Sequence, residues 1–153
     1  MVGEERAVTE KRTFSRTTSV ATNIEAPPLT VWEILTDAPR YPEWNTTVVS
    51  LTGNIQPGGK LQLVSALDPS RTFKLKVKAY DPPSRLIWGD ALGTRTYTLT
   101  QVDGGRTRFE MVEKIGGPVF PLFASKIPPF DATFEQFAAD LKAAAESKTE
   151  AGQ

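Results

Sequence analysis

The strongest constraint on the fold is an alternation of apolar and charged residues in segment 73–79. The apolar positions are Phe73, Leu75, Val77 and Ala79, and the residues between them are Lys74, Lys76 and Lys78. Successive side chains of a β-strand point to opposite faces, so this pattern predicts a strand with one buried face. The opposite orientation would bury the lysines at roughly several kcal/mol each. We therefore expect a solvated lysine face, which also keeps the sheet from pairing with neighbours.

Further strand patterns surround this segment and are joined by short turns. Strands are predicted at 60–65, 84–90, 94–102 and 107–115, with turns at Pro57-Gly58-Gly59, Asp81-Pro82-Pro83 and Asp103-Gly104-Gly105. Asp-Gly between two alternating runs is a strong hairpin signal. Turns this short connect antiparallel neighbours, because parallel strands need long crossover connections. The middle of the chain is therefore predicted to be an antiparallel meander.

Helices are predicted on both sides of the meander. A short helix is expected after Pro27-Pro28, ending before Asp37, and a second short turn is expected at 41–44. The C-terminal helix has an apolar stripe at helical spacing, made of Phe130, Phe134, Phe137, Ala138, Leu141 and Ala145. Segment 116–127 is either a loop or a separate short helix. An antiparallel sheet with an amphipathic helix across one face is an α+β fold.

Length and composition indicate one domain and exclude several kinds of chemistry. The 153-residue chain carries 18 basic and 18 acidic residues and has neither histidine nor cysteine. We expect a disordered tail at 1–13, a single domain at 14–147 and a frayed C-terminus at 148–153. Without His or Cys the usual imidazole and thiolate chemistry is impossible. No metal site and no cofactor are expected.

The same features limit the partners that we expect. Net charge is zero, and the lysine face has no interleaved aromatic residues, so no nucleic-acid partner is predicted. No apolar run is long enough to span a bilayer and no signal sequence opens the chain, so we expect no stable membrane insertion and a cytoplasmic protein. A monomer or weak homodimer is expected.

Several short motifs resemble a known superfamily over roughly residues 18 to 147. They are Ile24-Glu25-Ala26-Pro27, Val31-Trp32, Leu35-Thr36-Asp37, Tyr41-Pro42-Glu43-Trp44-Asn45, Pro57-Gly58-Gly59, segment 83–88, segment 105–108 and the closing helix at 137–141. They resemble the SRPBCC (START-like) superfamily, in its polyketide cyclase/dehydrase and lipid-transport branch. The resemblance implies a helix-grip fold: a curved antiparallel sheet of six or seven strands around a long C-terminal helix, with two short helices after the first strand. Members bind hydrophobic ligands, and only some are catalysts.

A curved sheet closing on one helix tends to leave a hollow that can bind a small molecule. Alternation predicts which side chains face it. The expected ligand-binding residues are Leu63, Phe73, Leu75, Val77, Trp88, Tyr97, Leu99, Phe109, Met111, Glu113, Phe130, Phe134 and Phe137.

Glu113 is the sharpest single feature, because the apolar face of strand 107–115 carries it inward. A carboxylate on an apolar face must be hydrogen-bonded, paired or protonated. It can orient a ligand hydroxyl or act as a general base. Alternatively, it lies near the rim and pairs with a cation such as Arg95 or Lys126.

Arg95 and Tyr97 are the other catalytic candidates. In catalytic members of the superfamily such side chains are thought to hold the substrate and polarise carbonyls, so the resemblance implies this role here. Tyr97 can donate a hydrogen bond from an apolar pocket, or it can pack in the core with its hydroxyl on backbone or water. Arg95 follows Gly93 closely, and the simpler expectation is that it is solvated.

Three functions therefore remain open. The first is binding of a hydrophobic small molecule such as a lipid, polyketide or other aromatic or isoprenoid compound, for transport or sequestration. The second is a metal-free enzyme of the polyketide cyclase/dehydrase type that uses Tyr97, Glu113 and Arg95. The third is a protein-partner-binding module. Convergence of Glu113 and Tyr97 on one enclosed site favours the enzyme, pairing between polar groups favours the binder, and an exposed apolar patch without a cavity favours the third.

Overall fold

The computed structural model describes residues 6–151. The strands are β1 (Val8–Lys11), β2 (Ser15–Ile24), β3 (Val48–Gly53), β4 (Lys60–Ser65), β5 (Phe73–Asp81), β6 (Arg85–Gly89), β7 (Gly93–Val102) and β8 (Arg106–Gly116). The helices are α1 (Pro28–Leu35), α2 (Tyr41–Trp44), α3 (Phe120–Phe123) and α4 (Asp131–Ala151). Short 3₁₀ turns are η1 (Ala38–Arg40), η2 (Asp103–Gly105) and η3 (Ala124–Lys126).

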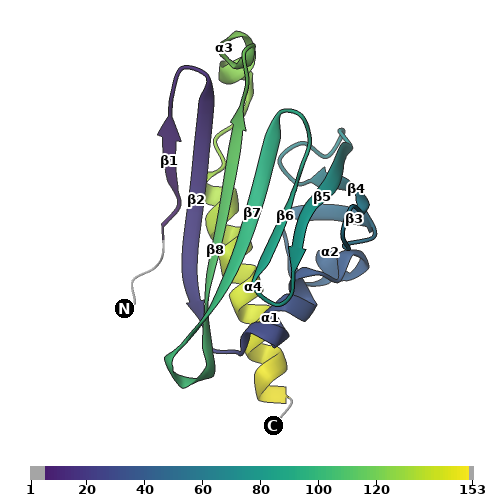
Figure 1. The fold of residues 1–153 in the computed structure, drawn as a ribbon, viewed down its shortest axis with the longest axis vertical. Coiled ribbons are helices and arrows are strands. Elements are labelled where there is room, and N and C mark those ends of the chain that lie inside the picture. The colour runs from purple at the N-terminus through teal and green to yellow at the C-terminus, as the bar shows by residue number, and fades with distance from the viewer. Residues whose placement is uncertain (1–5, 152–153) are drawn as a thin grey trace.

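All eight strands form one antiparallel sheet in the order β1-β2-β8-β7-β6-β5-β4-β3. The sheet is curved, and α4 runs along its inner face, as Figure 1 shows. α1 and α2 follow β2 and lie between the sheet and the C-terminal half of α4. This arrangement confirms the α+β helix-grip fold with two short helices after the first long strand.

The N-terminal segment differs from its prediction. Residues 8–11 were expected to be disordered, but β1 pairs with β2 in register from Val8↔Ser19 to Lys11↔Arg16. The sheet therefore has eight strands, whereas six or seven were expected. Backbone pairing requires little apolar surface, and Thr9 Oγ1 also donates a 2.6 Å hydrogen bond to Asp131 of α4.

The C-terminal prediction is also wrong in part. α4 continues to Ala151, so residues 148–151 are helical rather than frayed. Lys148 Nζ lies 3.5 Å from Glu33 of α1, which gives the last turns a contact with the rest of the protein. Residues 1–5 and 152–153 of the two expected tails lie outside the described residues.

The alternation predicted the faces of the central strands. Leu61, Val77, Leu86 and Trp88 are buried on the inner face, and Lys74, Lys76 and Lys78 are exposed on the outer face. On α4, the predicted stripe supplies Phe134, Phe137, Ala138, Leu141 and Ala145 to the core. The helix phase and the inner parity of the strands are therefore confirmed.

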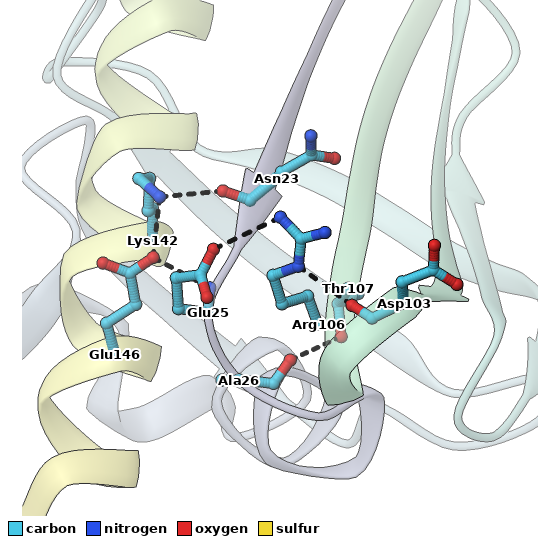
Figure 2. Close-up of polar contacts among 8 residues, drawn as sticks. All are labelled: Asn23, Glu25, Ala26, Asp103, Arg106, Thr107, Lys142 and Glu146. Carbon is cyan, nitrogen blue, oxygen red and sulfur yellow. Dashed lines mark hydrogen bonds and ion pairs between the residues drawn. The ribbon is translucent and has the colours of Figure 1, made fainter. Parts of the chain in front are cut away.

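A polar clamp joins α4 to the end of β2, as shown in Figure 2. Lys142 Nζ donates hydrogen bonds to the backbone oxygen of Asn23 at 2.8 Å and to Glu146 Oε2 at 2.6 Å. The same Glu146 oxygen accepts a 2.8 Å hydrogen bond from the backbone N–H of Glu25. These contacts fix the C-terminal half of α4 against the sheet.

The start of β8 completes this end of the molecule. Thr107 is fully buried, and its hydroxyl donates a 2.7 Å hydrogen bond to the backbone oxygen of Ala26. Arg106 lies 3.6 Å from Glu25 and donates to the backbone oxygen of Asp103 at 2.9 Å (Figure 2). This end of the grip is closed, which leaves the opposite end, where α4 begins, for an opening.

We expect the substitution Phe134→Asp to lower the free energy of unfolding by about 4 kcal/mol or more, because Phe134 is buried and the variant adds an unpaired charge. Chemical denaturation followed by circular dichroism measures the change. The control Ala143→Asp places the same residue on the exposed face of α4 and should cost less than about 1 kcal/mol. Equal effects of the two substitutions would contradict the helix phase described above.

Candidate functional site

A cavity of about 270 Å³ lies between the inner face of the sheet and the first turns of α4. Nine of the thirteen residues predicted to bind a ligand line it. They are Leu63, Phe73, Leu75, Trp88, Met111, Glu113, Phe130, Phe134 and Phe137. The catalytic candidate Arg95 also lines it. The wall is mainly apolar, with these charged groups in its deeper part.

The other four residues do not line the cavity. Val77, Tyr97, Leu99 and Phe109 are buried in solid core on the same inner face. Phe137 occupies the space beside them, with ring centroids 5.8 Å from Tyr97 and 6.3 Å from Phe109. Their expected ligand contact is therefore not supported, because the aromatic face of α4 fills this end of the hollow.

The structure also adds a wall that strand alternation did not predict. We name residues 117–130 the strap; it contains α3 and η3 and connects β8 to α4. Phe123 and Ile127 of the strap line the cavity, beside Phe130, which was predicted. Most of the strap belongs to segment 116–127, which was left open as a loop or a short helix. Its apolar residues between Gly116-Gly117 and Pro128-Pro129 were the available signal in the sequence.

Arg95 and Glu113 form an ion pair inside the grip. They are directly opposed on β7 and β8, and Arg95 Nε donates a 2.6 Å hydrogen bond to Glu113 Oε1. Their side chains are only 18% and 17% exposed. The expectation that Arg95 is solvated is therefore wrong. The partner of Glu113 is Arg95 and not Lys126. Burial makes this pairing necessary, since either charge alone would be strongly disfavoured.

Tyr97 extends the pair away from the cavity. Arg95 Nη1 donates a 3.3 Å hydrogen bond to the Tyr97 hydroxyl, and the guanidinium carbon lies 5.0 Å from the ring centre of Phe134. Glu113 Oε2 and Arg95 Nη2 have no hydrogen-bond partner within residues 6–151. A carboxylate oxygen and a guanidinium nitrogen thus remain unpaired on two side chains that line the cavity.

Burial and charge have opposing effects on these groups. Burial raises the pKa of Tyr97 to about 12, although the Arg95 guanidinium acts in the opposite direction. Burial disfavours the charged form of Arg95, but Glu113 and Tyr97 outweigh this effect and raise the pKa of Arg95. At neutral pH Arg95 is therefore a cation and Tyr97 is a neutral hydroxyl.

A second buried arginine holds the strap and was missed in the sequence. Arg16 on β2 is 7% exposed and donates hydrogen bonds to the backbone oxygens of Ile127 at 3.2 Å and Pro128 at 2.8 Å. Its guanidinium carbon lies 4.6 Å from the centre of the Phe130 ring. Burial lowers the pKa of Arg16. Arg16 lies on the same face of β2 as the buried residues Thr18 and Val20, and this alternation in the sequence would have predicted an inward side chain.

Within residues 6–151 there is no group of three or more acidic side chains arranged to hold a metal ion. No helix in this part of the chain combines the length and apolar character needed to cross a membrane. The charged side chains that line the cavity are Asp68, Arg71, Asp90, Arg95, Glu113 and Lys126, and among these Arg95 and Glu113 form an ion pair.

Comparison with known families agrees with the fold. The sequence model of the family described as polyketide cyclase/dehydrase and lipid transport matches residues 15–146. The chain belongs to this family. No protein with curated information matches the sequence significantly.

Solved structures show the same fold at low sequence identity. Zhui aromatase/cyclase from a Streptomyces species is 13% identical with a TM-score of 0.70, and the match covers 90% of this chain and 98% of that one. A START superfamily protein from Mycobacterium smegmatis is 16% identical with a TM-score of 0.63, covering 86% and 98%. A protein from Mesorhizobium loti is 22% identical with a TM-score of 0.66, covering 88% and 98%.

In this polyketide cyclase/dehydrase and lipid transport family member, we expect Glu113→Gln to cost about 2–4 kcal/mol of stability, because it leaves the Arg95 charge unpaired. Arg95→Met should cost a similar amount. The double variant Arg95→Met/Glu113→Gln should lose clearly less than the sum of the single variants, since neither charge remains. A double-mutant cycle by urea denaturation measures the coupling, and strict additivity would show that the pair is not coupled.

The stability of the protein should also fall at alkaline pH because of Tyr97. The unfolded chain loses the tyrosine proton near pH 10, whereas the folded protein keeps it until about pH 12. The stabilisation that the raised pKa of Tyr97 gives the folded protein is therefore complete below about pH 10, and it is lost as the pH rises through about 12.

Between pH 8 and pH 11.5, the free energy of unfolding of Tyr97→Phe should fall by about 2 kcal/mol less than that of wild type. Urea denaturation at both pH values measures this difference. The rest of the chain is identical in the two proteins, so its contribution largely cancels in this difference. An equal alkaline loss in both proteins would mean that Tyr97 ionises normally in the folded state.

Proposed function

We propose that this protein binds a hydrophobic small molecule in the cavity between the sheet and α4. The observation that carries the proposal is the cavity itself, whose wall joins apolar side chains from β4, β5, β6 and β8 to Phe130, Phe134 and Phe137. Small-molecule sites in proteins are usually concave and mainly apolar, with a few placed polar groups. The lining of this cavity has that composition.

The size of the cavity and its polar groups narrow the ligand class. Its volume of about 270 Å³ is near the lower end of the range for small-molecule pockets, roughly 300–1,000 Å³. This size favours a compact aromatic, isoprenoid or short acyl compound over a large lipid. Arg95 supplies a donor and Glu113 an acceptor at the wall, so a ligand with a carbonyl or hydroxyl group would be held in one orientation.

Pairing within the site favours a binder over an enzyme. Glu113 is held by Arg95, and Tyr97 receives a hydrogen bond from Arg95 but does not line the cavity. A general base needs to reach the proton that it removes, and Oε1 of Glu113 is already occupied by Arg95 Nε. A cavity of this kind also disfavours a module that binds only a protein partner.

A polyketide cyclase/dehydrase-type activity is the second candidate. Arg95 Nη2 and Glu113 Oε2 both lack a partner within the described residues, and both side chains line the cavity. A guanidinium can polarise a carbonyl while a carboxylate oxygen accepts a proton, without any metal. In this reading Tyr97 positions Arg95 from behind rather than touching the substrate.

The proposal is tested by native mass spectrometry of protein purified from its own host, followed by extraction of the bound compound. A bound apolar molecule supports the binding function. A consistently empty protein that also fails to bind an apolar fluorescent probe such as phenylnaphthylamine would overturn it. Release of a chemically altered compound on incubation would favour the enzyme.

We expect Leu75→Trp to weaken binding of the same probe by at least about tenfold, because the larger side chain fills the cavity that Leu75 lines. Lys76→Trp is the matched control, since Lys76 lies next along β5 and is exposed on the opposite face. Fluorescence titration measures both affinities. Equal affinity in the two variants would place the bound probe outside the cavity.

A further inference from the structure

The exposed apolar side chains of this protein gather at one end of the molecule. Between residues 6 and 150, eight large apolar side chains are exposed, and five of them lie in the turns and the short helix at one end of the molecule, where two of the five line the cavity. We name these five the apolar rim: Phe14, Leu67, Leu92, Val119 and Leu122. They are carried by the β1–β2, β4–β5 and β6–β7 turns, by the residue that precedes α3 and by α3 itself, all of which lie in the upper part of the molecule in Figure 1.

Backbone hydrogen bonds hold parts of the rim together. The N–H of Gly117 donates to the backbone oxygen of Phe14 at 3.0 Å, and the N–H of Gly116 donates to that of Leu92 at 2.9 Å. Phe14 and Leu92 also line a shared shallow hollow beside Lys114. Leu67 and Leu92 line the cavity as well, so the rim is continuous with the cavity wall.

The rim also carries positive charge. Arg71, Lys114 and Lys126 are exposed there, and none forms an ion pair within the described residues. The acidic residues that line the cavity are Asp68, Asp90 and the paired Glu113. Asp90 Oδ1 accepts two 2.9 Å hydrogen bonds from backbone N–H groups of its own turn. Exposed cations beside protruding apolar side chains are complementary to an anionic lipid surface.

We propose that the apolar rim docks this protein on the surface of an anionic lipid bilayer, so that the ligand passes directly between the bilayer and the cavity. The inference rests on the proposed binding function. Leu122 is 79% exposed, and the rim residues protrude from separate turns. Such a shape suits shallow insertion among lipid headgroups better than a flat protein interface, which needs about 800 Å² on each partner.

The test is flotation of the full chain with phosphatidylcholine vesicles that contain or lack about 30 mol % phosphatidylglycerol. Wild type should float with the anionic vesicles, and added salt should release it. The double variant Phe14→Ser/Leu122→Ser should bind at least about tenfold more weakly. Leu29→Ser is the matched control: Leu29 on α1 is 58% exposed, against 57% for Phe14, but lies at the other end of the molecule.

A second pair of variants tests the charges. Lys114→Gln/Lys126→Gln should weaken binding to anionic vesicles, whereas Lys74→Gln/Lys76→Gln on the outer face of β5 should not. An equal loss in both variants would overturn docking through the rim. Circular dichroism should be unchanged in all four variants, which excludes unfolding as the cause of a loss. Lys126 lines the cavity, so probe binding in solution should be unchanged in the other three variants.

The outcomes separate this inference from the proposed function. If wild type binds the apolar probe in solution but does not float with either vesicle, docking on membranes is wrong and the binding function stands. If wild type instead captures a soluble protein and the Phe14→Ser/Leu122→Ser variant does not, the rim is a protein interface and the membrane proposal is overturned. If the probe does not bind at all, the proposed function fails first.

Discussion

The packing of α4 into the concave face of the sheet is the interaction on which the rest of the structure depends. Phe137 lies at its centre, with ring centroids between 5.8 and 6.3 Å from those of Tyr41, Trp44, Tyr97 and Phe109. These rings come from α2, β7 and β8, so a single side chain of α4 connects the two sides of the grip. Aromatic contacts of this kind add to the free energy gained by burial. Where the aromatic side chains fill the hollow the core is solid, and beyond them the cavity begins.

The charges in the cavity follow from the same architecture. A curved sheet points the inner residues of neighbouring strands toward one another, and the register between β7 and β8 places Arg95 opposite Glu113. Each charge alone would be strongly disfavoured at this burial, whereas the pair compensates both and leaves a guanidinium nitrogen and a carboxylate oxygen unpaired on side chains that line the cavity. The site can therefore recognise a polar group on a mainly apolar ligand without any metal or imidazole.

The two ends of the molecule have different roles. At one end the clamp between Lys142, Glu146 and the end of β2 closes the grip. At the other end the strap is held by Arg16 through two backbone oxygens, so its position depends on a few polar contacts and on Phe130. A closed end gives the fold its stability, and an end bounded by turns leaves a way into the cavity. This division is consistent with membership of a family described by both polyketide cyclisation and lipid transport.

By itself, the sequence determined the order of the elements, the inner face of the central strands and the phase of α4. These properties are local, because alternation and helical spacing are set by neighbouring residues. It also determined that Glu113 points inward. Only the tertiary structure decided that Arg95 pairs with it, that β1 joins the sheet, and that Val77, Leu99 and Phe109 lie in solid core beside the cavity. Each of these depends on which distant segment fills the space next to a residue, and periodicity along a strand carries no information about that.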